Sequence, residues 1–176
     1  MFRRPLTWSV LAVLGLVAAF AGYWFAPWKL FTDRTVDDAL STPAPVAVTT
    51  AGNASSAVPS GPVVLRQGTF AAHEHATTGT VRIVRLPDGT RSLEIAGLST
   101  SDGPDLRVWL TDQAVSSGTS GWRVFDDGLH LELGKLKGNR GNQVYPIPAS
   151  ADLGAYRSVT IWCIRFSVSF GAATLA

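Results

Sequence analysis

Cysteine and methionine are nearly absent from this chain of 176 residues, which contains one of each, Cys163 and Met1. A single cysteine cannot form a disulfide within the chain, and the sequence has neither a C-x-x-C nor a C-x-x-C-H motif. Dithiol exchange within one chain and covalent c-type haem attachment are therefore excluded. An ordinary blue-copper site would also need an axial methionine, and Met1 stands at the extreme N-terminus.

Charged residues are also scarce, at 16% of the chain, and the net charge is only +2. The arginines are scattered and form no basic stripe, which argues against a nucleic-acid partner. There is no Ser/His/Asp set with a recognisable local context and no carboxylate pair at a plausible spacing. The sequence therefore gives no support for hydrolase chemistry.

The N-terminal region contains one long apolar run. Leu6–Phe25 comprises twenty residues without a charge, and aromatic residues stand near its ends, at Trp8, Tyr23, Trp24 and Trp28. At the helical rise of about 1.5 Å per residue, the run matches the hydrocarbon thickness of a bilayer. We therefore predict a cytoplasmic tail at 1–5 and a transmembrane signal anchor at 6–28 in a single-pass protein of the cell membrane.

The alternative is a cleaved signal peptide with Ala19-Phe20-Ala21 as its A-x-A site. The run is longer than the apolar core of a usual signal peptide, which favours the anchor. Arg3 and Arg4 favour a cytoplasmic N-terminus, although Lys29 and Arg34 weaken the charge bias. Both interpretations place the C-terminal domain on the extracytoplasmic side.

Residues 29–62 are predicted to be a linker. From about Thr32 onwards the composition is rich in proline, alanine, threonine and serine, without helical or strand periodicity. We expect a flexible, semi-extended spacer between the membrane and the domain. The acidic residues Asp33, Asp37 and Asp38 are expected to be solvated near the membrane surface.

The remaining residues, 63–176, are predicted to form one β domain, because strand-like runs recur at short intervals between turn residues. The clearest hairpin joins Thr80–Leu86 to Thr90–Ala96 through Pro87-Asp88-Gly89. Further strands are predicted at Asp105–Leu110, Gly121–Phe125, His130–Leu133, Gln143–Ile147 and Tyr156–Phe170, with a last short strand or tail at Gly171–Ala176. The pattern predicts an all-β fold, an antiparallel β-sandwich or barrel of about seven or eight strands.

The longest predicted strand, Tyr156–Phe170, carries Cys163. Alternation predicts that one set of its residues faces the core: Thr160, Trp162, Ile164, Phe166, Val168 and Phe170. Cys163 and Arg165 lie on the opposite face, which changes from apolar to polar along the strand. Two interpretations stay open for Cys163: a partly exposed thiol whose thiolate is favoured by Arg165, or a small buried hydrophobic residue.

Two further stretches contain residue types that bind ligands. His73-Glu74-His75 places two imidazoles on one face of an extended segment, and with His130 and Cys163 they would supply nitrogen and sulfur ligands to a metal ion. The alternative is that these histidines are surface residues of a glycine-rich loop. Gly138–Gln143 lacks the Lys-Ser/Thr pair and following helix of a phosphate-binding loop, so we predict a structural role.

Four sets of residues, taken in order, resemble one family. They are Gly68-Thr69-Phe70 with His75-Ala76-Thr77-Thr78-Gly79; Gly103-Pro104-Asp105-Leu106; Leu133–Pro148, which includes Tyr145; and Tyr156–Ala173, which includes Ile161-Trp162-Cys163. Over about Leu65–Leu175, the chain resembles the DM13 domain, also called the electron-transfer DM13 domain. The order and spacing of the four sets make the resemblance specific.

The resemblance implies an extracellular β-rich domain with a proposed redox role. The family's hallmark cysteine corresponds to Cys163, which would act as a free thiol or as the ligand of a prosthetic group. Haem or copper is a candidate cofactor, with His73, His75 or His130 as a further ligand, and the absence of any cofactor fits equally well. The residues expected to support the site are Trp162, Arg165, Gly79, Asp105 and Tyr145.

Two functions therefore stay open. The first is a membrane-tethered, extracytoplasmic redox or electron-transfer module that acts through Cys163. The second is a non-redox β-sandwich that binds a protein or small ligand at the cell envelope. Both describe an electron-transfer or binding module rather than a stand-alone enzyme, with the membrane and an unidentified redox or envelope protein as partners. The accessibility of Cys163 separates them.

Overall fold

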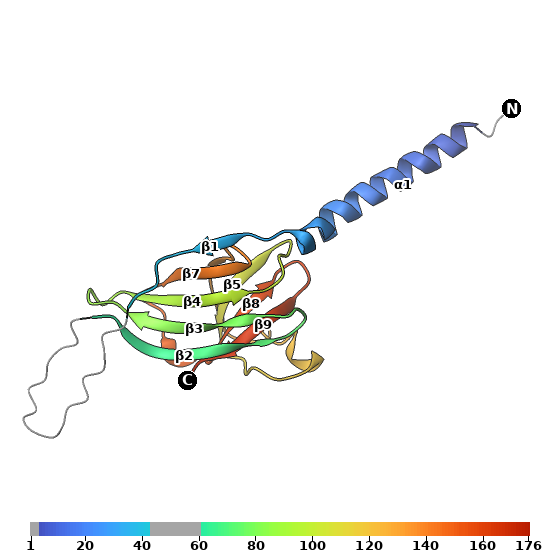
Figure 1. Cartoon of the computed structure of the whole chain (residues 1–176). Coiled ribbons are helices and arrows are strands. Elements are labelled where there is room, and N and C mark those ends of the chain that lie inside the picture. Colours follow the sequence, from blue (N-terminus) through green and yellow to red (C-terminus); the bar gives the residue numbers. More distant parts are fainter. Residues whose placement is uncertain (1–3, 43–60) are drawn as a thin grey trace, which may run out of the picture.

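The computed structural model describes residues 4–42 and 61–176. In this part of the chain, a long helix α1 (Arg4–Phe25) and a short 3-10 helix (Pro27–Phe31) precede nine strands (Figure 1). The strands are β1 (Thr35–Asp37), β2 (Val63–Ala72), β3 (Thr78–Arg85), β4 (Arg91–Ser99), β5 (Leu106–Thr111), β6 (His130–Lys135), β7 (Arg140–Ile147), β8 (Ser158–Cys163) and β9 (Val168–Thr174). Two more 3-10 turns lie at Thr119–Gly121 and Leu153–Ala155.

The nine described strands form one sheet in the order β1-β7-β4-β3-β2-β9-β8-β5-β6. All neighbours are antiparallel except β1 and β7, which are parallel. Strand β2 joins the two halves of the sheet, because residues 63–69 pair with β3 and residues 70–72 pair with β9. The predicted all-β sandwich or barrel is confirmed, with nine strands instead of seven or eight.

The sheet rolls until strands from its two ends approach each other. Residues 136–139 connect β6 to β7, and the Tyr145 hydroxyl of β7 donates to the Lys135 carbonyl of β6 at 3.3 Å. The interior is filled by apolar side chains from most of the strands, among them Val81, Ile83, Leu93, Ile95, Val108, Leu110, Val159, Ile161 and Val168. Burying each such side chain contributes roughly 1.5–3 kcal/mol, so this single core stabilises the rolled sheet.

A second, smaller apolar cluster lies on the outer face of β5, β8 and β9. It contains Trp109, Trp162 and Ala172 from these strands together with Phe125. The ring centroids of Trp109 and Trp162 are 5.4 Å apart. Phe125 belongs to the connection between β5 and β6, so this connection covers the outer face and leaves β8 buried on both sides.

The prediction of one continuous strand at Tyr156–Phe170 is wrong. Strands β8 and β9 pair antiparallel around a turn at residues 164–167, which we call the cap turn. Its sequence, Ile-Arg-Phe-Ser, contains no Gly, Pro, Asn or Asp, and Ser167 is its only residue of a type common in turns. Ser167 nevertheless adopts a left-handed φ of 46°.

The predicted inward face of this strand is also wrong in β8. Val159, Ile161 and Cys163 face the main core, whereas Trp162 faces the outer cluster. Alternation could not decide between the faces, because both are buried. The predicted strand at Gly121–Phe125 is wrong as well, since this segment forms a 3-10 turn and bends.

The other predicted strands correspond to β3, β4, β5, β6, β7 and the second half of the last hairpin. The Pro87-Asp88-Gly89 hairpin between β3 and β4 is confirmed: the Gly89 N–H donates to the Leu86 carbonyl at 2.9 Å. Strands β1 and β2 had no prediction of their own.

The first part of the predicted linker belongs to the fold. Residues 33–42, here called the edge segment, run along β7 and contain β1. The predicted acidic residues also form contacts: Asp33, which is exposed, pairs with Arg140 at 2.9 Å, and Asp38 pairs with Lys137 at 2.5 Å. Gly138 and Gly141 permit this approach, because a Cβ on either would overlap a backbone oxygen of the edge segment. Residues 43–60 of the predicted linker lie outside the described residues.

Helix α1 is long and apolar enough to cross a membrane. The candidate span, Thr7–Lys29, has a mean hydropathy of 1.9. The helix projects from the rolled sheet, and the chain turns back onto the domain at Ala26, whose φ is 42° (Figure 1). The predicted spacer between helix and domain is therefore replaced by a direct connection.

Docking of β1 is testable with Gly141→Ala. Gly141 has a φ of +94°, and an added Cβ would also overlap the Val36 carbonyl oxygen. Gly89→Ala is the matched control, because Gly89 has a φ of +84° but open space around it. Both variants should lose roughly 1–2 kcal/mol to backbone strain, and Gly141→Ala about 1–3 kcal/mol more. Urea unfolding of the full chain measures the difference, and equal losses would contradict the docked position of β1.

Candidate functional site

Cys163 ends β8 and is fully buried, with 0% of its surface exposed. It lies opposite Leu106 of β5 and Val168 of β9, within the main core. Burial raises the pKa of its thiol, and the nearby negative charge of Glu74 acts in the same direction. Backbone N–H groups in the cap turn and at residue 105 lower this pKa but do not outweigh burial. The sulfur is therefore a covered, protonated thiol at neutral pH, as the second interpretation expected.

Arg165, in the cap turn, points away from Cys163 and towards α1. Its guanidinium donates to the carbonyl oxygens of Tyr23 at 3.0 Å and Trp24 at 2.7 Å, in the last turn of the helix. It also lies over both aromatic rings, 5.6 and 5.3 Å from their centroids. A cation is favoured at a helix C-terminus, where free carbonyl groups carry partial negative charge. The predicted stabilisation of a thiolate by this side chain is replaced by a bond to α1.

Other contacts also hold the cap turn in place. Arg123 donates to the carbonyl oxygens of Phe166 at 2.9 Å and Ser167 at 3.2 Å. The ring of Phe166 stacks on Phe25 of α1, with centroids 5.8 Å apart. On the opposite side, the Ile164 N–H donates to the Asp105 carbonyl at 3.0 Å. Access to Cys163 from this end therefore requires the turn to leave α1, Arg123 and β5.

The three histidines do not gather around Cys163. His73 bonds through Nδ1 to the Ser169 hydroxyl at 2.8 Å, and its Nε2 is buried without a hydrogen-bond partner. His75 packs on Phe170, with centroids 3.9 Å apart, and His130 packs on Trp109 at 4.1 Å. Within residues 4–42 and 61–176, no three His, Cys, Asp or Glu side chains are arranged to hold a metal ion.

Haem and copper do not fit this arrangement. The Cys163 sulfur lies in the packed core and lines neither of two cavities at the end of the domain that meets α1. These cavities measure about 240 and 220 Å³, below the roughly 300–1,000 Å³ of usual cofactor and ligand sites. His75 lines the smaller cavity but has no second ligand beside it. We therefore derive no step through a prosthetic group.

The predicted supporting residues have mostly structural positions. Trp162 packs in the outer cluster, and Gly79 has a φ of 127° in β3. Tyr145 donates to the Gln143 side chain at 2.7 Å, and burial raises its pKa to about 12. Asp105 pairs with Arg107 at 2.8 Å, and its backbone contacts the cap turn. Of these four residues, Trp162 directly precedes Cys163 but faces the outer cluster, and Asp105 contacts the cap turn next to Cys163.

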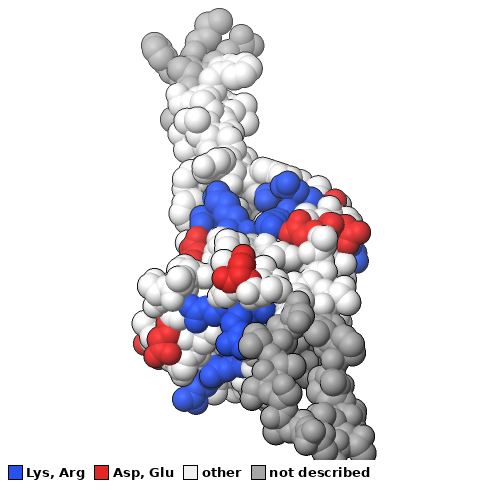
Figure 2. Space-filling model, turned by 90° about the vertical axis from the view of Figure 1, so that its left-hand side faces the viewer, with Lys and Arg blue, Asp and Glu red and all other residues white. Residues whose placement is uncertain are grey.

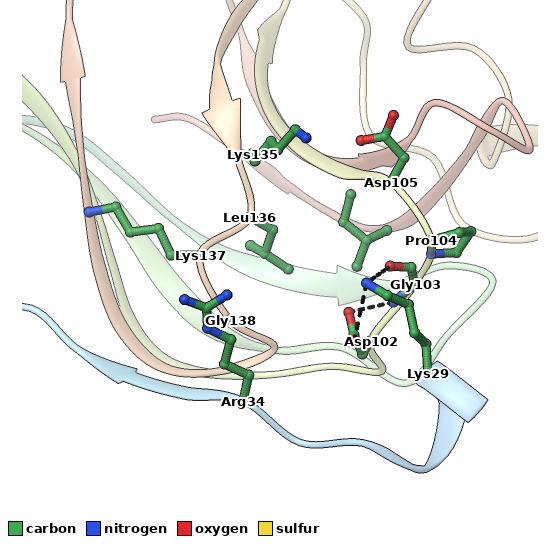
Figure 3. A pocket seen from close by; sticks show the side chains of 11 residues that line it. Lys29, Arg34, Asp102, Gly103, Pro104, Asp105, Lys135, Leu136, Lys137 and Gly138 are labelled. Carbon is green, nitrogen blue, oxygen red and sulfur yellow. Dashed lines mark hydrogen bonds and ion pairs between the residues drawn. The ribbon is translucent and has the colours of Figure 1, made fainter. Parts of the chain in front are cut away.

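The two cavities lie side by side at the end of the domain that meets α1. The larger one, here called the basic cavity, is lined by Lys29, Arg34, Lys135 and Lys137 together with residues 102–106, 136 and 138 (Figure 3). The smaller one is mostly apolar and is lined by Phe25, Ala26, Pro27, Phe166 and Phe170 among others. They share the wall formed by Lys29 and residues 102–104. Neither cavity was predicted from the sequence, because Lys29 and Arg34 were assigned to a linker.

The rolled β domain that contains Cys163 corresponds to a known family. A family model described as Electron transfer DM13 matches residues 69–175, which is more than half of the chain. The chain belongs to the DM13 family. The match runs from within β2 to the end of β9 and supports a redox or electron-transfer module. No curated protein and no solved structure matches the chain.

The burial of His73 predicts that the stability of the domain depends on pH. Desolvation lowers its pKa in the folded protein, so the unfolded chain binds a proton first as the pH falls below about 6.5. Stability is then fully present above pH 6.5 and decreases below it, by at most about 1.4 kcal/mol per pH unit for one proton. His73→Asn keeps an acceptor near Ser169 and should flatten this decrease in urea titrations between pH 7 and 5.

His75→Asn is the comparison variant for this experiment. The pKa of His75 is also lowered by desolvation, but the neighbouring Glu74 opposes the shift. The His75→Asn variant still contains His73, so its stability should retain the part of the pH dependence that comes from His73. If the free energy of unfolding of His73→Asn decreased with pH as steeply as that of the wild type, the buried imidazole would not control stability in acid.

Proposed function

We propose that this DM13 chain is a redox module anchored in the cell membrane by α1 as a single span, with its β domain on the extracytoplasmic side. The observation that carries the proposal is the bond from Arg165 to α1, because it joins the turn covering the family's cysteine to the membrane helix. Arg3 and Arg4 before the apolar run support a cytoplasmic N-terminus. The proposed topology places Cys163 close to the outer surface of the bilayer.

The redox group in this proposal is the Cys163 thiol, exposed when the cap turn opens. Its proton passes to water, and the thiolate attacks a disulfide of a partner protein. A bond forms between Cys163 Sγ and one partner sulfur, while the partner's S–S bond breaks and releases the other sulfur as a thiolate. The partner's disulfide is the oxidant. Backbone N–H groups around the sulfur favour the thiolate once water reaches it.

A second candidate is a non-redox binding module at the membrane surface. The complete burial of Cys163 and its raised thiol pKa favour this candidate, because a protonated, covered thiol does not react. The two functions differ in one measurable property, which is the rate at which the native cap turn opens.

The test is modification of Cys163 by DTNB, a disulfide reagent, in the full chain reconstituted in vesicles. The redox proposal expects slow labelling of the native protein at a rate well above that of global unfolding. Arg165→Gln removes the bonds to α1 and should raise the labelling rate about threefold to tenfold, as expected for exposed hydrogen bonds. Arg85→Gln is the matched control. Arg85 is the last residue of β3 and lies outside the cap turn, so its replacement should leave the labelling rate unchanged.

Global unfolding rates of each variant, measured in urea and extrapolated to water, provide the reference. Labelling that never exceeds the global unfolding rate, in both the native chain and Arg165→Gln, would refute the thiol role and leave the binding module. A labelling rate raised by Arg165→Gln without a change in global unfolding would support local opening of the cap turn.

A further inference from the structure

The basic cavity lies where the candidate membrane span ends. Lys29 is the last residue of the span and also lines the cavity, and Arg34 follows five residues later on the edge segment. Lys135, the last residue of β6, and Lys137, in the connection between β6 and β7, line the same cavity (Figure 3). On the face seen in Figure 2, Lys and Arg side chains gather below the helix with Asp and Glu among them. Cationic groups thus approach the cavity from two sides.

The carboxylates around this cavity are already paired. Asp102 lies 3.6 Å from the Lys29 ammonium, which also donates to the Gly103 carbonyl at 3.0 Å. Asp105 pairs with Arg107 and Asp38 pairs with Lys137.

Two cations that line the cavity are left over. Among the described residues, Arg34 and Lys135 form no ion pair. Lys135 is also attracted by Asp105, but that carboxylate already pairs with Arg107. The cavity and its paired partners therefore carry a surplus of two positive charges, since the five cations Lys29, Arg34, Lys135, Lys137 and Arg107 stand against the three carboxylates Asp102, Asp105 and Asp38. An anion with several oxygen atoms is the ligand that this arrangement fits.

We propose that the basic cavity binds the phosphate of an anionic phospholipid headgroup. Arg34 presents a guanidinium fork and Lys135 an ammonium group, and both donate to phosphate oxygens. The cavity begins at the end of the membrane span, which is the depth at which headgroups lie. The inference rests on the membrane anchoring in the proposed function and is independent of the redox role of Cys163.

The test uses the full chain purified in detergent, with lipid retention measured by native mass spectrometry. The probes are phosphatidylglycerol and phosphatidylcholine, each added separately. The wild type should retain phosphatidylglycerol preferentially, and Arg34→Gln with Lys135→Gln should lose about fivefold in retention for each charge removed. Arg85→Gln with Arg157→Gln is the control, because it removes the same charge from exposed residues outside the cavity and should keep the preference.

Several outcomes would overturn the proposal. They are equal retention of both lipids by the wild type, equal retention by the cavity and control variants, and displacement of the lipid by millimolar inorganic phosphate, which would identify a free-phosphate site. Circular dichroism and thermal unfolding of both double variants establish that they are folded. Co-flotation with phosphatidylcholine vesicles tests membrane anchoring by itself. A chain that fails to float would refute the anchoring in the proposed function, and not only the lipid site.

Discussion

The contact between the cap turn and α1 is the constraint on which the end of the domain next to the helix depends. Helices end with unpaired carbonyl groups, and here Arg165 satisfies two of them from a turn of the β domain. The same turn covers the hallmark cysteine and contributes Phe166 to the apolar cavity beside the helix. The helix end, the two cavities and the cover of Cys163 are therefore parts of one packed unit, and a change in the position of α1 would be transmitted to all of them.

The roll of the sheet explains why the cysteine is buried so completely. Strand β8 has the main core on one side and the outer aromatic cluster on the other, so neither face is available to solvent. The edges of the sheet are protected differently. Strand β1 covers β7, and β6 carries Glu132 and Lys135, charges that disfavour pairing with another chain. Two cavities lie at the end of the sheet next to α1.

Features set by local sequence could be predicted, and features set by distant partners could not. Uninterrupted apolar residues indicated α1, and Pro87-Asp88-Gly89 indicated the hairpin of β3 and β4, because each depends on neighbouring residues. The cap turn was missed because its geometry depends on Arg123 and on α1. Strand β1 was missed because its docking depends on glycines about a hundred residues away. Cys163 was singled out from the motifs of the resemblance, whereas its burial follows from the pairing of β8 with β5 and β9 and from its place in the main core.

The edge segment also determines how the domain is connected to α1. It begins at the end of the sheet next to α1 and runs along β7, while β2 begins at the opposite end of the sheet (Figure 1). The described chain stops at residue 42 and resumes at residue 61, and both points are remote from α1 (Figure 1). The position of Cys163 relative to α1 therefore depends on the single bend at Ala26 and not on the length of chain between those points. With α1 anchored in a membrane, as proposed, the domain would stay next to the bilayer, and its encounters would depend on lateral diffusion and on partners able to approach that surface.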